Sequence, residues 1–131
     1  IAKIEQGLLV LLGIEIRDTK EDSLWLASKV AALRIFSDEK GVMNKSITES
    51  GGEVIVVSQF TLHAKTRKGN RPSYIKGARS EQAIPLYQQF KECLALTIGR
   101  HVKSGEFGAD MKVSLINDGP VTILIDTKNK E

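Results

Sequence analysis

The chain has 131 residues, of which 41% are hydrophobic and 27% charged, which predicts a single globular domain over residues 1–131 with a substantial core. Its 19 basic and 16 acidic residues leave a net charge of only +3, which permits a nucleic-acid partner without requiring one. No apolar run reaches the roughly 18 residues of a membrane-spanning helix. Cys93 is the only cysteine, so an intrachain disulfide is excluded, and we expect a reducing, cytoplasmic location.

The first half of the chain predicts a strand followed by a helix. Residues 7–15 form a continuous apolar run, typical of a strand covered on both faces. Thr19-Lys-Glu-Asp then resembles a capping box, apolar residues from Trp25 to Leu33 follow at helical spacing, and we expect the helix to end before the turn signal at 38–41. The sequence starts at Ile1 rather than Met, and residues 1–4 resemble the tail of a strand. We therefore expect that the N-terminal strand of the fold is missing from this sequence.

The second half opens with the same strand–helix pattern. Residues 53–62 predict a second apolar strand, and the polar, basic residues 65–72 predict a loop. Ser80 offers a cap for a second helix, and Pro85 is expected to distort its first turn. The apolar residues of this helix share one face at spacings of three and four: Ala83, Tyr87, Phe90, Leu94 and Ile98.

The end of the chain predicts three further strands, near 101–107, through 112–116 and through 121–126. The order is then a strand tail, two strand–helix units and three closing strands. This order predicts an α/β fold layered β/β/α, with helices on one face of a sheet and a second sheet layer on the other.

The sequence offers no candidate metal or cofactor site. One cysteine and two histidines, His63 and His101, form no ligand cluster, and neither glycine-rich phosphate fingerprint occurs. We therefore expect no metal and no cofactor. His63 follows Thr61 by two residues, so the two side chains could share one face of a strand as a Thr–His nucleophile pair. A surface histidine at a strand end is the interpretation that we favour.

Hydrogen-bonding side chains follow the apolar part of the second strand, at Ser58, Gln59 and Thr61. In sheets with helical crossovers, ligands bind beyond the carboxyl ends of the strands. Backbone N–H groups that are unpaired at such an end can also form an oxyanion hole. A plain strand end, in which Ser58 and Thr61 only satisfy the backbone, is the interpretation favoured by composition alone.

Residues 117–122, Asn-Asp-Gly-Pro-Val-Thr, join the last two predicted strands. These residue types are strong turn formers, and a plain connection explains them without any function. A functional interpretation requires a rigid backbone that faces a ligand. The Gly119-Pro120 peptide can supply such a backbone, particularly as a cis bond.

The two motifs together resemble the D-aminoacyl-tRNA deacylase family, also described as D-Tyr-tRNA(Tyr) deacylases. Ser-Gln-Phe-Thr-Leu and Asn-Asp-Gly-Pro-Val-Thr occur in the family's order, and the resemblance covers nearly the whole chain. The further matching segments are Arg34-Ile-Phe-Ser-Asp, Val42-Met-Asn, Arg71-Pro-Ser-Tyr and Gly105-Glu-Phe-Gly-Ala-Asp-Met. The family's Gln-Arg-Val segment near the N-terminus, whose arginine braces the Gly-Pro loop, has no counterpart here.

The resemblance implies a homodimeric, metal-free enzyme that hydrolyses the ester between a D-amino acid and the terminal adenosine of tRNA. It implies that Gly119-Pro120 is cis and enters the partner's active site, where it excludes L-side chains by clash. Glycine, which has no side chain, would pass this filter. The catalytic segment would be Ser58, Gln59, Phe60 and Thr61.

Thr61 has two possible roles under this resemblance. A threonine hydroxyl is a weak nucleophile without a base. We therefore prefer backbone amides around Gln59, Phe60 and Thr61 as the oxyanion site, with water attacking with help from the substrate's 2′-hydroxyl. The alternative is that Thr61 itself accepts the acyl group.

Three groups of residues complete the predicted site. Phe107 and Met111, with Asn117, are assigned to the substrate's adenosine, because aromatic and thioether groups suit the flat face of a base. Core packing explains Phe107 and Met111 equally well. The basic residues beyond the first motif are assigned to the tRNA phosphates, with a solvated charged loop as the alternative: Lys65, Arg67, Lys68 and Arg71.

Two rival functions stay open at this stage. One is a catalytically inactive RNA-binding module on the same fold, and the other is a hydrolase of small-molecule esters. Within the family, an animal sister group acts on mischarged L-alanine. Its first motif differs, so Ser58 and Phe60 favour the D-specific branch.

Overall fold

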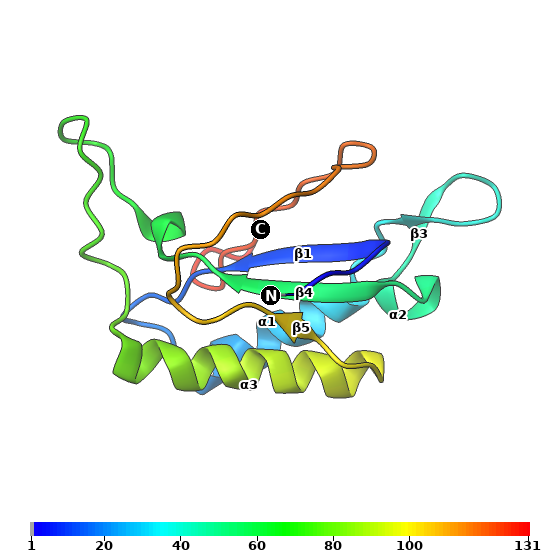
Figure 1. Ribbon diagram of the computed structural model, residues 1–131, viewed down its shortest axis with the longest axis horizontal. Helices are drawn as coiled ribbons and strands as arrows, with labels where there is room; N and C mark the ends of the chain where they lie inside the picture. Colours follow the sequence, from blue (N-terminus) through cyan, green and yellow to red (C-terminus); the bar gives the residue numbers. More distant parts are fainter. Residues whose placement is uncertain (1) are drawn as a thin grey trace.

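The computed structural model of the protein describes residues 2–131, and its centre is a parallel sheet (Figure 1). The sheet contains β1 (Gly7–Leu12), β4 (Glu53–Ser58) and β5 (Lys103–Ser104), with β4 in the middle. β1 and β4 pair in continuous register, from Gly7 opposite Glu53 to Leu12 opposite Ser58. Because the strands are parallel, the carboxyl ends of β1 and β4 meet at one edge of the sheet.

Two helices cover one face of this sheet, α1 (Lys20–Ala32) and α3 (Ser80–Ile98) (Figure 1). Both bury an apolar stripe against β4, and all five apolar residues predicted for the second helix are buried. The hydroxyl of Tyr87, on α3, donates to the Val56 carbonyl oxygen at 3.1 Å. Burial raises the pKa of this hydroxyl. The core therefore lies between the helices and β4.

The start of α1 and both ends of α3 follow the sequence signals, whereas α1 ends at Ala32, earlier than the predicted end before the 38–41 turn. At the start of α1, the Thr19 backbone N–H donates to Asp22 Oδ2 at 2.8 Å, as the capping-box pattern predicts. α3 begins at Ser80 with Arg79 in the cap position, one residue earlier than predicted, and it continues through Pro85. It ends at Gly99, whose φ of 71° is the left-handed conformation that glycine favours. No helix within residues 2–131 has the length and apolarity needed to cross a membrane.

Four short elements were not predicted from the sequence. β2 (Phe36–Ser37) and β3 (Met43–Lys45) form an antiparallel hairpin around the predicted 38–41 turn, and the one-turn helix α2 (Ile47–Ser50) follows. The fourth is the 3-10 helix η1 (Phe60–His63). It corrects the predicted strand 53–62, which ends at Ser58. The reason is that β1 ends at Leu12 opposite Ser58, so within the described residues no neighbouring strand continues to pair with the chain.

The predicted closing strands are the main error. Of 101–107, only Lys103–Ser104 is a strand, and 112–116 and 121–126 form no strand within residues 2–131. Ile1 lies outside the described residues, and residues 2–4 are not a strand. A strand needs a neighbour, and the C-terminal segment runs along the other side of the sheet without one (Figure 1). The α/β class is confirmed, but the second sheet layer does not form among residues 2–131.

Candidate functional site

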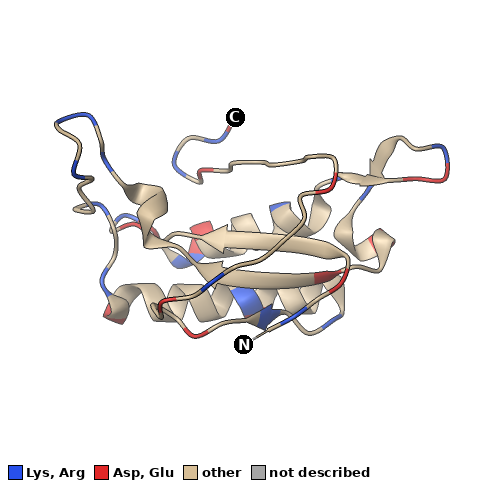
Figure 2. Cartoon of the chain, turned by 45° about the horizontal axis from the view of Figure 1, so that its top comes forward, with Lys and Arg blue, Asp and Glu red and all other residues tan. Residues whose placement is uncertain are grey.

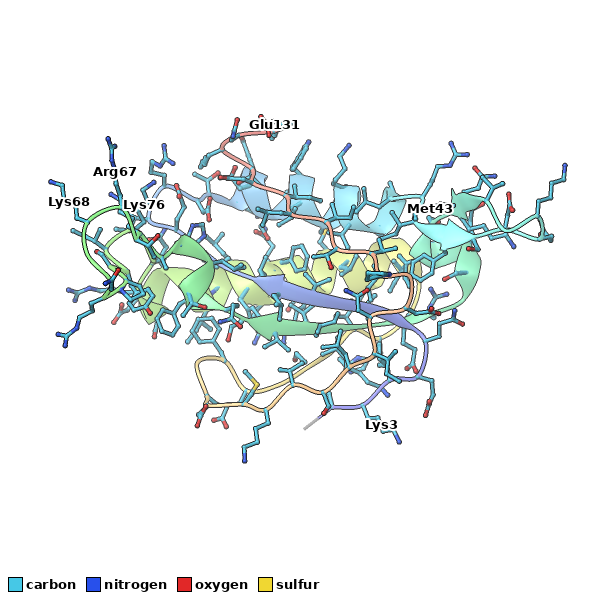
Figure 3. All side chains as sticks on the ribbon, turned by 90° about the horizontal axis from the view of Figure 1, so that it is seen from above. Lys3, Met43, Arg67, Lys68, Lys76 and Glu131 are labelled. Carbon is cyan, nitrogen blue, oxygen red and sulfur yellow. The ribbon has the colours of Figure 1, made fainter. Side chains whose placement is uncertain are left out.

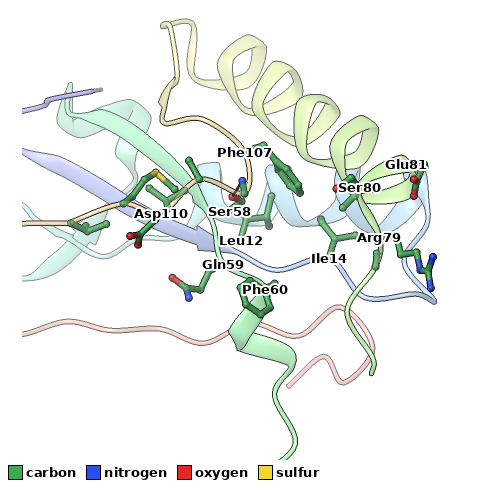
Figure 4. Close-up of a pocket in the computed structure, with 17 residues that line it drawn as sticks. Leu12, Ile14, Ser58, Gln59, Phe60, Arg79, Ser80, Glu81, Phe107 and Asp110 are labelled. Atoms are coloured by element: carbon green, nitrogen blue, oxygen red, sulfur yellow. Dashed lines mark hydrogen bonds between the residues drawn. The ribbon is translucent and has the colours of Figure 1, made fainter. Parts of the chain in front are cut away.

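A pocket of about 700 Å³ lies at the carboxyl ends of β1 and β4, beside the first turn of α3 (Figure 4). We call it the strand-end pocket. Its walls come from the two strand ends, from residues 78–83 and from the segment 107–111. The predicted residues that line it are Ser58, Gln59, Phe60, Phe107 and Met111.

Ser58 ties two of these walls together. Its Oγ accepts a hydrogen bond at 3.1 Å from the backbone N–H of Gly108. The adjacent Phe107 ring packs edge-on against Tyr87, with the ring centroids 5.3 Å apart. Ser58 therefore fixes the segment that carries Phe107 and Met111, which is a structural role at the edge of the pocket.

The backbone amides after β4 differ in availability. The Gln59 N–H donates to the Leu12 carbonyl oxygen at 2.8 Å, which extends the sheet ladder by one bond. The chain then turns into η1, and within residues 2–131 the N–H groups of Phe60 and Thr61 have no hydrogen-bond acceptor. Two of the three amides around the predicted oxyanion site are thus free to bind a ligand, and that of Gln59 is not.

Thr61 lies beside the strand-end pocket rather than in its lining. Its exposed hydroxyl accepts a hydrogen bond from the side-chain amide of Gln59. The Nδ1 atom of His63 lies 3.8 Å from Glu15 Oε2. Within residues 2–131 no hydrogen bond joins Thr61 to His63, so the geometry offers no support for a Thr–His nucleophile pair.

The Gly-Pro loop (residues 117–122) contains a cis peptide bond between Gly119 and Pro120, as the resemblance implied. Asn117 closes the loop, because its Oδ1 accepts from the Val121 N–H at 2.8 Å and its Nδ2 donates to Thr122 Oγ1 at 2.9 Å. The loop lies at the opposite end of the sheet from η1 (Figure 1). One chain therefore does not bring its own Gly-Pro loop to its strand-end pocket.

The basic arm (residues 65–76) projects from the end of the molecule that carries η1 (Figure 2). Paired backbone hydrogen bonds between Lys65 and Ser73, of 2.7 and 2.8 Å, close its base. Edge-to-face packing of Phe60 and Tyr74, at 4.9 Å between centroids, joins it to η1. Arg67, Lys68 and also Lys76, which sequence reasoning missed, point outward at this end (Figure 3). The four predicted tRNA-binding residues are thus all on one projection: Lys65, Arg67, Lys68 and Arg71.

Sequence reasoning also missed several pocket walls. Leu12 and Ile14 come from the end of β1, Arg79 and Glu81 from the start of α3, and Asp110 from the C-terminal segment (Figure 4). The walls from β1 and α3 could have been predicted, because in α/β folds the carboxyl end of a parallel strand and the first turn of the helix that follows lie at the same edge of the sheet. Within residues 2–131 no group of three His, Cys, Asp or Glu side chains could hold a metal ion.

Comparison with known proteins agrees with these features. The family model described as D-Tyr-tRNA(Tyr) deacylase matches residues 1–126. The D-aminoacyl-tRNA deacylase of Bacteroides fragilis (strain YCH46) is 63% identical over 98% of this chain and 85% of its own. That of Akkermansia muciniphila is 65% identical over 95% of this chain and 83% of its own.

Two solved structures share the fold. The c-Myc DNA Unwinding Element Binding Protein has a TM-score of 0.85 and 42% identity, over 92% of this chain and 81% of that one. A probable eukaryotic D-amino acid tRNA deacylase has a TM-score of 0.59 over 71% of this chain and 55% of its own, and at 20% identity it supports the fold alone. The match to the family model and the relatives that match almost all of this chain together establish that it belongs to the D-Tyr-tRNA(Tyr) deacylase family.

Proposed function

We propose that the protein hydrolyses the ester bond of D-aminoacyl-tRNA and so releases a free D-amino acid and tRNA. The observation that carries this proposal is the pair of unpaired N–H groups on Phe60 and Thr61, at a strand end that opens into a pocket. The pocket volume of about 700 Å³ is within the range of sites for ligands the size of an aminoacyl-adenosine. Removal of D-amino acids from tRNA would make the enzyme a chirality check in translation, which takes place in the cytoplasm.

In the reaction, water adds to the ester carbonyl carbon, and negative charge develops on the carbonyl oxygen. The Phe60 and Thr61 amides stabilise this charge, because fixed donors at an oxyanion need no reorganisation during the step. The C–O bond to the ribose then breaks, and the ribose oxygen takes a proton. The substrate's 2′-hydroxyl assists the attacking water, so no side chain of the pocket has to act as a base.

Thr61 shapes the approach to the pocket in this mechanism. Its hydroxyl lies outside the pocket lining and is engaged by Gln59, which supports this role over that of an acyl-accepting nucleophile. Thr61→Ala separates the two roles. We expect hydrolysis within a few-fold of the natural enzyme, and near-total loss with substrate binding intact would establish the nucleophile instead.

Phe107 and Met111 hold the terminal adenosine in this proposal, because both line the pocket and Phe107 lies across it from Phe60 (Figure 4). Asn117, also assigned to the adenosine from the sequence, has both ends of its side-chain amide bonded within the Gly-Pro loop. We therefore assign Asn117 to holding that loop in shape.

Selectivity for D-amino acids comes, in this proposal, from the Gly-Pro loop of a second copy of the chain. The loop lies at the opposite end of the sheet from η1 (Figure 1), and the segment that carries it exposes Ile116 by 93% and Leu124 by 85%. Apolar exposure of this size favours a homodimer in which these side chains are covered. Backbone carbonyls of Gly119 and Pro120 would then face the α-carbon and exclude L-side chains, whereas glycine mischarged on tRNA-Ala would also be accepted.

The alternative function is nucleic-acid binding without catalysis. The basic arm suits either function, and one of the solved structures is named as a DNA-binding protein. The N–H groups of Phe60 and Thr61, which have no acceptor within residues 2–131 and lie beside the strand-end pocket, favour catalysis, because a pair of fixed backbone donors suits a developing oxyanion.

The decisive experiment is a deacylation time course with D-Tyr-tRNA, L-Tyr-tRNA and glycyl-tRNA-Ala, with the free D-tyrosine ethyl ester as a fourth substrate. We expect fast release of D-tyrosine and glycine and slow release of L-tyrosine. Binding of tRNA without release of D-tyrosine would support the binding module, and equal turnover of the free ester would support a small-molecule hydrolase.

A further inference from the structure

Glu15 is a buried acid just beyond β1, with only 5% of its surface exposed. A buried carboxylate is costly unless it is paired and hydrogen-bonded. Arg17 donates from Nε to Glu15 Oε1 at 2.7 Å, and the Glu15 N–H donates to Asp18 Oδ2 at 2.8 Å. The Asp18 contact fixes the Glu15 backbone, the Arg17 contact holds one carboxylate oxygen, and the second oxygen faces His63.

His63 is the last residue of η1, and its side chain is 20% exposed. Its Nδ1 lies 3.8 Å from Glu15 Oε2, and the other side of the ring lies on Gly13. A Cβ atom on Gly13 would be 3.1 Å from His63 Cδ2 and 3.0 Å from the Gln59 carbonyl oxygen. The ring therefore fills the space between η1 and the chain that leaves β1.

Apart from the packing of the Phe60 ring on Tyr74, the rest of η1 makes few contacts that fix it. Its start is fixed by the bond from Gln59 N–H to Leu12, but Phe60, Thr61 and Leu62 are all exposed. A 3-10 helix of four residues is too short to be stable by its own hydrogen bonds. The contacts of His63 are thus the anchor at the end of η1, two residues after Thr61.

We propose that His63 is a positioning residue of the reaction: its contacts with Gly13 and Glu15 fix η1 so that the Phe60 and Thr61 N–H groups face the strand-end pocket. This inference rests on the proposed role of those amides. His63 does not line the pocket, and its Nδ1 faces Glu15. It therefore acts through η1 rather than on the substrate or the attacking water.

Three variants test this role. His63→Asn places an amide nitrogen where Nδ1 stands, His63→Leu keeps apolar bulk on Gly13 without a polar atom, and His63→Ala removes both. In steady-state deacylation of D-Tyr-tRNA, we expect the Leu and Ala variants to lose roughly ten- to a hundredfold in kcat, the range for a small misplacement of a catalytic group. KM should change by less than about twofold, and the Asn variant should keep most of the kcat.

His101→Asn is the matched control, because the same substitution at an exposed histidine away from η1 should leave kcat unchanged. Thermal unfolding of each variant checks that the fold persists. An unchanged kcat in His63→Leu overturns the inference. Equal loss of kcat in the Asn and Leu variants also overturns it, since it indicates that the imidazole itself takes part in proton transfer.

Hydrogen exchange supplies a readout that does not depend on the substrate. The Leu62 and Ala64 amides are bonded to Gln59 and Thr61, at 3.3 and 3.1 Å. They should exchange faster in His63→Leu than in the natural protein or His63→Asn. Unaltered exchange overturns the inference even if D-Tyr-tRNA proves to be the wrong substrate, whereas an inactive natural enzyme with altered exchange overturns only the proposed function.

Discussion

The strand-end pocket and the Gly-Pro loop are built in opposite ways. The pocket residues are fixed by their own chain, through the β1–β4 ladder, the Ser58–Gly108 bond and packing on α3. Within residues 2–131, the Gly-Pro loop is closed by the side chain of Asn117 alone, on a segment that has no strand partner and exposes apolar side chains. In the proposed function, the chemistry therefore belongs to one chain, and the selectivity belongs to a loop that is presented outward. Substitutions at the two ends should therefore change different kinetic quantities.

The largest effect is expected from removal of one oxyanion donor. Phe60 is the first residue of η1, a position where proline fits the backbone, so Phe60→Pro deletes the N–H with little change in the turn. We expect kcat to fall by about 10²–10³-fold relative to Phe60→Ala. Phe60→Ala is the matched control because it loses the same ring and keeps the N–H. Steady-state kinetics with D-Tyr-tRNA measure kcat for both variants. Similar kcat values would show that the Phe60 N–H does not stabilise the oxyanion.

Asn117→Ala tests the other end of the molecule. It deletes the bonds to Val121 and Thr122, each worth about 1 kcal/mol. The loosened loop should admit L-side chains, so the ratio of D-Tyr-tRNA to L-Tyr-tRNA hydrolysis should fall by roughly tenfold while kcat for the D-substrate changes little. Thr122→Val removes one bond only and should give an intermediate ratio. A fall in D-hydrolysis with an unchanged ratio would assign the loop to catalysis instead.

The basic arm should affect binding alone. Arg67→Ala combined with Lys68→Ala removes two outward cations at the η1 end (Figure 3). We expect weaker tRNA binding and a salt dependence that is shallower by about one unit per lost phosphate contact. Lys40→Ala, on the exposed β2–β3 turn, is the control. An unchanged salt slope in titrations of tRNA binding would leave the arm as a solvated loop.

The sequence predicted those strands and helices whose packing and pairing partners lie within this chain. The strands β1 and β4, the capping box at Thr19 and the buried face of α3 were predicted correctly, but β1 ends at Leu12 rather than near residue 15 and is only partly buried. The errors fall on segments that need a neighbouring strand to form a sheet. Residues 112–116 and 121–126 have a composition that suits strands, but within residues 2–131 no strand lies beside them to pair with. The turn into η1 was also missed, because the apolar residues of Phe60 to Leu62 continue the strand pattern after the pairing has ended.

The site was predicted in a similarly uneven way. Ser58 to Phe60, Phe107 and Met111 do line one pocket. The first three were found because they directly follow a strand, and Phe107 and Met111 were found through the family resemblance. The occupied amide of Gln59 and the anchor formed by Glu15 and His63 depend on contacts between β1 and η1. Residues this far apart in the sequence give no spacing signal.

The smallest effect is expected where the C-terminal tail contacts α1. Lys128 Nζ lies 2.9 Å from Asp22 Oδ2. Burial raises the pKa of Asp22, but the bonds from Lys128 and from Thr19 lower it more, to about 2. Its folded-state pKa is thus below its ordinary value near 3.8, so the stabilisation is complete above that pH and is lost as the pH falls through about 2.

Lys128→Met should therefore lower the melting temperature by at most a few degrees at neutral pH, with a smaller difference from the natural protein in acid. Lys112→Met is the control, because Lys112 forms no ion pair within the described residues 2–131. If this contact also orients the segment that leads back from the Gly-Pro loop, Lys128→Met should lower the ratio of D- to L-hydrolysis slightly and leave kcat for D-Tyr-tRNA unchanged. A lower kcat with an unchanged ratio would mean that the tail supports the pocket through α1, and the division between the two ends would then be incomplete.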